Sequence, residues 1–315
     1  MSAPIFDGAA CLIPLTPTYV LVDPMLGEPL PEIQITPGTE FKAMQAQREA
    51  AWQRPVELVQ LHPSIELLAH QYPYLVSMED EQDPLLGMTL DMAQDERLES
   101  QAEGLTGSGQ SIHRIGGWLQ STLAPHELSR CMAGLMHVNS EASTRARYLR
   151  LGDRRVLAWL RTALGNQRVS DALGRISRWL YVDPFGQLDA IDTSREVPLP
   201  LRFTVPEWLD FMDGHALHQI VARCLGQIDD AGHYLSLPSS HDIYLRAKLS
   251  RRQAQQAAQH WPDRFRTARD FSAWAVLDLM HPGREIKLPV KAEPSDTIDL
   301  LSSLILATLQ EQSIP

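Results

Sequence analysis

Few of the side chains that could carry out acid–base or metal chemistry are grouped in this sequence. His233 and His241 flank a loop-like segment that ends at Asp242 (GHYLSLPSSHD), and an imidazole beside a carboxylate can act as a general base. His215 and His218 are three residues apart on an expected helix and could share one face, but no carboxylate at a matching spacing completes a metal site. We therefore predict no metal ligands, and an enzyme with a site around His233, His241 and Asp242 remains an alternative.

Motifs for nucleotide binding and for nucleophilic catalysis are also missing. The glycine-rich stretch GLTGSGQS at residues 104–111 lacks the Gly-Lys-Ser/Thr ending of a phosphate-binding loop, and no strand clearly precedes it. No Gly-x-Ser-x-Gly elbow occurs in the chain. We predict no catalytic residue, no cofactor-binding residue and no cofactor, which favours a binding protein over an enzyme.

Charge is strongly segregated along the 315 residues, which carry a net charge of −11. Residues 79–103 contain nine acidic side chains and one basic side chain, whereas the run from Arg145 to Arg178 contains nine arginines and two aspartates. Such a run could contact phosphates, so a nucleic-acid-binding regulator that uses Arg145 to Arg178 is a second alternative. Nucleic acid is the less favoured partner, because these arginines alternate with core-like apolar residues and the chain has a pI near 5.4.

A turn at Gly152-Asp153 divides the arginine-rich run into a strand-like half and a helical half. Asp153 is expected to cap a helix that begins at Arg154, because aspartate accepts from the exposed amides of a first helical turn. Arg155 is expected to pair with Asp153 or with another carboxylate, which leaves Arg154 free to contact a second protein. The candidate partner-binding residues are Arg154, Arg161, Arg168, Arg175 and Arg178.

The elements that must position these residues change in kind along the chain. β-branched and aromatic runs predict strands at 18–24, 56–61, 73–79 and 146–151. Helical spacing of apolar residues predicts helices near 64–70, in part of the acidic segment, and at 125–138, 156–164 and 169–180.

The second half of the chain is expected to be mainly helical. Thr204 and Glu207 have the spacing of a capping box, and Ser250, Asp270 and Ser295 each precede a helical segment. We predict an α+β fold with two lobes. Residues 1–194 form a lobe of mixed short strands and helices with its core at 18–164, and residues 195–315 form a mainly α-helical lobe.

Four segments in order resemble the DUF4123 family, the adaptor chaperones of the bacterial type VI secretion system. TYVLVD (18–23) is similar to the family's opening strand, YPYLV (72–76) to its second motif, and GGWLQS (116–121) to a segment that precedes a helix. The stretch LRLGDRRVL (149–157) is similar to its most recognisable motif, f-R-f-y-D-P-R-v-L. Arg150, Asp153 and Arg155 match that motif, whereas Gly152 and Arg154 stand where the family usually has an aromatic residue and a proline.

The resemblance implies a protein without enzymatic activity that works in the bacterial cytoplasm. Its partners would be a secreted toxic effector and the VgrG spike protein onto which the effector is loaded. Composition agrees with this location: no apolar run approaches the roughly 20 residues of a membrane span, and the N-terminus lacks the basic region of a signal peptide. The three cysteines, Cys11, Cys131 and Cys224, are odd in number and widely spaced, as expected of reduced thiols.

Overall fold

A computed structural model describes residues 8–106, 112–141, 143–231, 240–260 and 268–280. These residues form two compact units, and each is considered by itself. Unit 1 contains residues 8–99 and 112–212, and unit 2 contains residues 100–106, 213–231, 240–260 and 268–280. The structure is a mixed α+β fold with an antiparallel sheet and a helical C-terminal region, as the sequence predicts.

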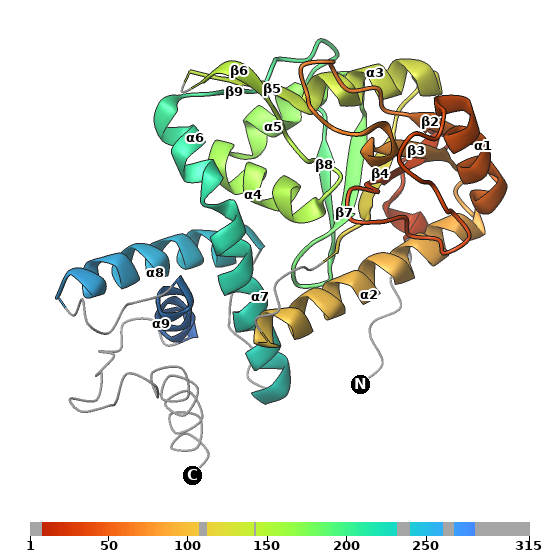
Figure 1. Cartoon of the computed structure of the whole chain (residues 1–315). Helices are drawn as coiled ribbons and strands as arrows, with labels where there is room; N and C mark the ends of the chain where they lie inside the picture. Colours follow the sequence, from red (N-terminus) through yellow and green to blue (C-terminus); the bar gives the residue numbers. More distant parts are fainter. Residues whose placement is uncertain (1–7, 107–111, 142, 232–239, 261–267, 281–315) are drawn as a thin grey trace. The chain divides into compact units, whose positions relative to one another are not determined.

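Unit 1 is built on a six-stranded antiparallel sheet with the strand order β2-β3-β1-β4-β7-β8 (Figure 1). Its strands are β1 (Thr18–Val22), β2 (Val56–Leu58), β3 (Tyr74–Ser77), β4 (Ile115–Gln120), β7 (Arg178–Val182) and β8 (Leu188–Asp192). Strands β1 and β4 are buried along their whole length. Both faces of the sheet are therefore covered at these two strands, which explains why their sequences are mostly apolar and do not alternate with charged residues.

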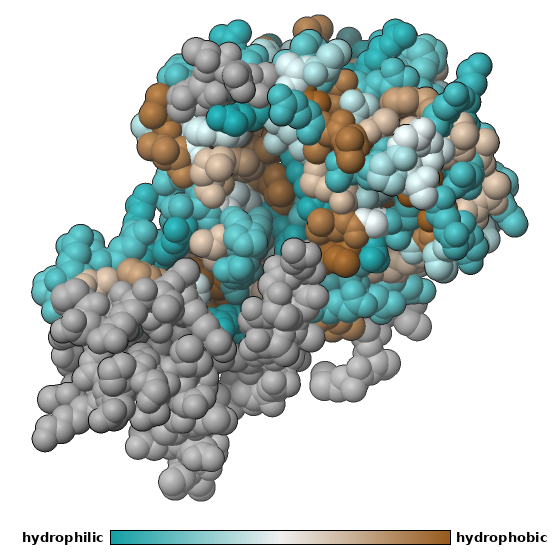
Figure 2. Space-filling view, viewed as in Figure 1, coloured by the Kyte–Doolittle hydropathy of each residue, from teal (hydrophilic) through white to brown (hydrophobic). Residues whose placement is uncertain are grey.

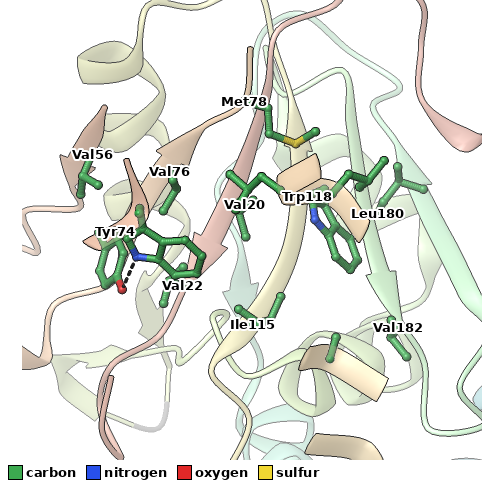
Figure 3. Close-up of a cluster of buried hydrophobic side chains, with 14 of the residues drawn as sticks. Val20, Val22, Val56, Tyr74, Val76, Met78, Ile115, Trp118, Leu180 and Val182 are labelled. Atoms are coloured by element: carbon green, nitrogen blue, oxygen red, sulfur yellow. Dashed lines mark hydrogen bonds between the residues drawn. The ribbon is translucent and has the colours of Figure 1, made fainter. Parts of the chain in front are cut away.

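One face of the sheet packs against α1 (Phe41–Trp52) and the first part of α2 (Pro84–Thr106). Figure 3 shows the side chains of this cluster, among them Val20, Val76 and Trp118. The two indole groups within it are satisfied by hydrogen bonds: Trp52 donates to the Tyr74 hydroxyl at 3.1 Å, and Trp118 donates to the hydroxyl of a threonine on α2 at 2.9 Å. Buried polar groups that are paired in this way avoid the cost of desolvation.

The opposite face of the sheet is covered by α3 (Pro125–Leu135), α4 (Arg154–Leu164) and α5 (Asn166–Leu173). Strand alternation directs Leu21, Leu119 and Trp179 toward these helices, and all three side chains are buried. Gly117 in β4 has a positive φ, and a Cβ atom there would lie 2.2 Å from the Leu180 carbonyl oxygen. Only glycine fits this position without displacing β7.

A smaller three-stranded sheet completes unit 1, with the order β6 (Ser143–Tyr148), β5 (His137–Ser140) and β9 (Arg202–Phe203). Helix α6 (Val205–Met212) follows and packs its Trp208 and Phe211 rings against Phe203. Trp159 of α4 donates to the Phe211 carbonyl oxygen at 3.1 Å. These contacts hold residues 195–212 in unit 1, so the two units divide after Met212 rather than after the predicted residue 194.

Unit 2 contains α7 (Gly214–Ala231), α8 (Ser240–His260) and α9 (Ala268–Met280). Val221, Ile243 and Val276 are buried, one from each helix. The Ser250 hydroxyl donates to a carboxylate oxygen of Asp278 at 2.6 Å, which ties α8 to α9. No helix of the described residues is both long enough and apolar enough to span a membrane.

Several predicted elements are confirmed at their predicted places. Strands β1, β2 and β3 and helices α3 and α4 lie where the patterns place them, whereas the strand expected at 146–151 is β6 (Ser143–Tyr148), which ends three residues earlier. The capping box before α6 is formed, with the Thr204 amide donating to Glu207 at 2.9 Å and the Glu207 amide donating to the Thr204 hydroxyl at 3.4 Å. The helix expected after Ser295 lies outside the described residues.

Four predictions about helices are wrong in extent or in kind. The helix expected at 169–180 ends at Leu173, because Gly174 has a positive φ, and the following apolar run forms β7. The helix expected near 64–70 is only a 3-10 turn, Ala69–Gln71, because Leu68 is extended. Ser250 is expected to cap the start of a helix, but it lies inside α8, which continues through it. The acidic segment is expected to form a short helix, but it forms the 23-residue helix α2.

Candidate functional site

The motif LRLGDRRVL forms the turn that leads into α4, and Asp153 is the N-cap of that helix. Its carboxylate accepts from the Arg155 backbone amide at 3.1 Å and from the Arg155 guanidinium at 2.7 and 3.0 Å. The predicted cap and the predicted pairing of Arg155 are both confirmed. A single carboxylate thus satisfies the helix start and neutralises one of the two arginines placed there.

Arg150 connects this turn to the end of β1. Its guanidinium donates to the Asp23 carboxylate at 2.7 Å and lies 3.8 Å from the Asp153 carboxylate. Gly152 makes the approach of the two segments possible, because a Cβ atom there would lie 2.6 Å from the Asp23 Cβ. The backbone of Gly152 also packs against Gly116 of β4, where an added Cβ atom would lie 2.8 Å from the Gly152 carbonyl oxygen. Packing therefore requires a glycine at position 152.

Arg154 is buried, with a relative exposure of 3%. Its guanidinium donates to Glu96 of α2 at 2.7 Å and to the Ile115 carbonyl oxygen of β4 at 3.0 Å. Glu96 also accepts from the backbone amide of Arg114 at 2.9 Å. The prediction that Arg154 is free to contact a partner is wrong, because this side chain joins α4 to α2 and β4 inside unit 1.

The electrostatics of the turn follow from this arrangement. Burial raises the pKa of Asp23, and the Arg150 charge only partly opposes that effect. Burial acts in the same direction on Asp153, but the charge and hydrogen bonds of Arg155, with the charges of His113 and Arg150, hold its pKa far below the usual range. Both carboxylates are buried, so they are closed to substrate and serve to join segments.

The other candidate arginines are mostly engaged in ion pairs within unit 1. Arg161 pairs with Asp189 and the Tyr181 hydroxyl, Arg168 pairs with Glu207, and Arg178 pairs with Asp192. Arg175, by contrast, is exposed. The described part of the run from Arg145 to Arg178 is therefore not a continuous exposed basic face, which is what a phosphate-binding surface requires.

The alternative enzyme site is only partly described. His233 lies outside the described residues, nothing is described of the His241 side chain, and Asp242 lies in the first turn of α8. His215 lies within hydrogen-bonding distance of Gln219, and His218 within hydrogen-bonding distance of the Tyr244 hydroxyl. Within the described residues no group of three or more histidine, cysteine and acidic side chains is arranged to hold a metal ion.

Helix α6 carries a surface feature that sequence reasoning missed. Val205, Leu209 and Met212 recur at the i, i+4, i+7 spacing of one helix face and are 41%, 64% and 62% exposed. We call these three residues the α6 face. The exposed residues Val197 and Leu199 lie in the segment that precedes the helix, and Figure 2 shows apolar side chains at the surface in this region. The sequence alone could have indicated this face, because α6 carries apolar residues on two sides. Trp208 and Phe211 form the side that packs against unit 1, and the α6 face is the other side.

In comparisons with known proteins, no family model matches the chain, and no curated protein or solved structure shows significant similarity to it. Function is therefore inferred from the motifs and geometry of the chain itself.

Proposed function

We propose that this chain is an adaptor chaperone of a bacterial type VI secretion system. It binds a toxic effector in the cytoplasm and delivers it to the VgrG spike protein through contacts between protein surfaces, without catalysis. The α6 face is the observation that carries the protein-binding part of this proposal. Contiguous exposed apolar side chains on a helix are unusual on a monomer that has no partner, and they commonly mark a protein-binding site.

The chemistry of the α6 face suits a protein partner. A partner helix or loop would cover Leu209 and Met212, and burial of apolar area contributes about 25 cal/mol per Å² before the costs of association. On the opposite side of α6, Trp208 and Phe211 pack against Phe203 and hold the helix in place. The face is therefore held in place before binding, which reduces the entropy lost on association.

The assignment to secretion rests on the motif resemblance rather than on the α6 face. Arg150, Asp153 and Arg155 match the most recognisable family motif, and in this chain they join the start of α4 to the end of β1. A motif that organises the core of unit 1 fits a shared scaffold that presents variable binding surfaces. The ion pairs of the arginine-rich run are consistent with a scaffold role and do not favour nucleic-acid binding.

The proposal is tested by co-expressing the full chain with effector and VgrG proteins encoded beside it and measuring complex formation by affinity capture. The wild-type chain is expected to capture both, and Leu209→Glu is expected to weaken capture of at least one of them at least tenfold, because it places a charge in the apolar contact. The matched control is Leu15→Glu, which adds the same charge at a residue that is 97% exposed and lies outside α6.

Two results would count against the proposal in different ways. Failure of the wild-type chain to bind any effector or spike protein would overturn the adaptor function. Normal binding by a folded Leu209→Glu variant would be consistent with an adaptor function, but it would show that the binding site is not the α6 face.

A further inference from the structure

A pair of histidines from distant parts of unit 1 lies outside the ion-pair network around Asp153. His62 lies in the loop after β2, and His137 is the first residue of β5. Their rings are in contact, with centroids 4.6 Å apart and a tilt of 31°. The fold therefore brings together two imidazoles that are far apart in the sequence.

Both rings direct a nitrogen toward the same atom. The Ser64 hydroxyl oxygen lies 2.8 Å from His62 Nδ1 and 3.4 Å from His137 Nε2. The Ser64 backbone amide donates to His62 Nδ1 at 3.2 Å, so that nitrogen carries a lone pair. His137 Nε2 carries a lone pair in the neutral tautomer that has its proton on Nδ1.

We propose that His62 and His137 form a binding site for a divalent transition-metal ion that prefers imidazole, namely Zn²⁺, Ni²⁺ or Cu²⁺. The ion would take a position near the Ser64 hydroxyl, between His62 Nδ1 and His137 Nε2. Metal–nitrogen distances of about 2.0–2.1 Å are shorter than the present nitrogen–oxygen distances, so the rings rotate inward and the hydroxyl moves aside or becomes a third ligand. Water fills the remaining positions, because His62 is exposed and His137 is half-buried.

The donor set determines which ions are accepted. Imidazole nitrogen suits zinc, copper and nickel, whereas magnesium and calcium need oxygen ligands. No carboxylate completes a group of three ligands within the described residues, so the site discriminates against Mg²⁺ and Ca²⁺.

The inference is tested with the full chain, freed of any histidine tag, titrated with Zn²⁺ or Cu²⁺ alone in an isothermal calorimeter. The wild-type chain is expected to show a site whose affinity falls at least tenfold in His62→Ala and in His137→Asn. Electron paramagnetic resonance of the Cu²⁺ complex is expected to show coupling to two imidazole nitrogens, reduced to one in either variant. Ca²⁺ is expected to give no heat of binding.

Two controls make the outcome decisive. His126→Ala removes an exposed histidine on α3 and is expected to leave affinity and stoichiometry unchanged. His62→Ala changes an exposed loop residue, so its loss of binding cannot be attributed to unfolding of β5, and circular dichroism checks the fold of both histidine variants. Zinc or copper binding that is unchanged in His62→Ala, or the absence of binding in the wild-type chain at millimolar metal, overturns the inference.

Discussion

At the scale of single residues, the ion pair between Arg154 and Glu96 is the contact whose loss we expect to cost most. Arg154→Ala leaves the buried Glu96 carboxylate without its cationic partner, so the free energy of unfolding is expected to fall by about 3 kcal/mol or more. Chemical denaturation with urea measures the change. Arg175→Ala is the control, because that side chain is exposed and its loss should change stability by no more than about 0.5 kcal/mol. Equal effects of the two substitutions would contradict the role given to Arg154.

Asp183, at the end of β7, gives a residue-scale prediction about pH. Burial raises its pKa from 3.8 to about 6, although its carboxylate accepts from the Phe185 and Gln187 amides. A raised pKa in the folded state means that the folded chain binds the proton more tightly. The contribution of this group to stability is therefore fully present below about pH 4 and is lost as the pH rises through 6.

Asp183→Asn keeps a carbonyl oxygen for the two amides and removes the titration. We expect the variant to lose this pH dependence between about pH 4 and 6. At pH 7 it should be more stable than the parent by up to about 3 kcal/mol, because each pKa unit corresponds to about 1.4 kcal/mol. Urea midpoints measured across this pH range test the prediction, and a variant that is less stable than the parent at pH 7 would refute it.

At the scale of elements, Gly152 controls how closely the turn before α4 approaches β1. Gly152→Ala forces a Cβ atom to within 2.6 Å of the Asp23 Cβ, so β1 and the turn must separate and the Arg150–Asp23 pair is strained. We expect the free energy of unfolding to fall by about 2 kcal/mol or more, within the range known for overpacking. Thermal or urea denaturation provides the measurement.

The matched control for this substitution is Gly87→Ala. Gly87 lies on α2, and a Cβ atom there meets nothing within 4 Å. Because alanine is a better helix former than glycine, this variant should be more stable than the parent by about 0.5–1 kcal/mol. Destabilisation by both substitutions would show that the local space around Gly152 is not the cause.

The elements that could be predicted from the sequence are those determined by residues close together in the chain. The β-branched run of β1, the cap at Asp153 and the capping box at Thr204 each depend on neighbours within a few residues. The burial of Arg154 could not be found in this way, because its partner Glu96 is 58 residues away. The helix extended through Trp179 failed for a related reason, since a short apolar run fits a buried strand as well as a helix until Gly174 and the pairing with β4 decide between them.

At the scale of the whole molecule, the α6 face is expected to govern self-association of the purified chain. With no partner present, Val205, Leu209 and Met212 remain in water, and contacts between molecules through this face reduce the exposed apolar area. Leu209→Glu is expected to make the second virial coefficient more positive without changing the melting temperature. Static light scattering and circular dichroism measure the two quantities.

The control is again Leu15→Glu, which changes the net charge of −11 by the same amount. If general repulsion were responsible, this variant would reduce association as much as Leu209→Glu does. A difference between the two assigns the effect to the α6 face.

The pair formed by Arg154 and Glu96 also has a consequence for evolution. A buried charge without its partner is costly, so neither position can change alone without loss of stability. In relatives of this chain, residues 96 and 154 are therefore expected to covary. Those with proline at 154 should carry an uncharged residue at 96, and those that keep glutamate at 96 should keep arginine at 154.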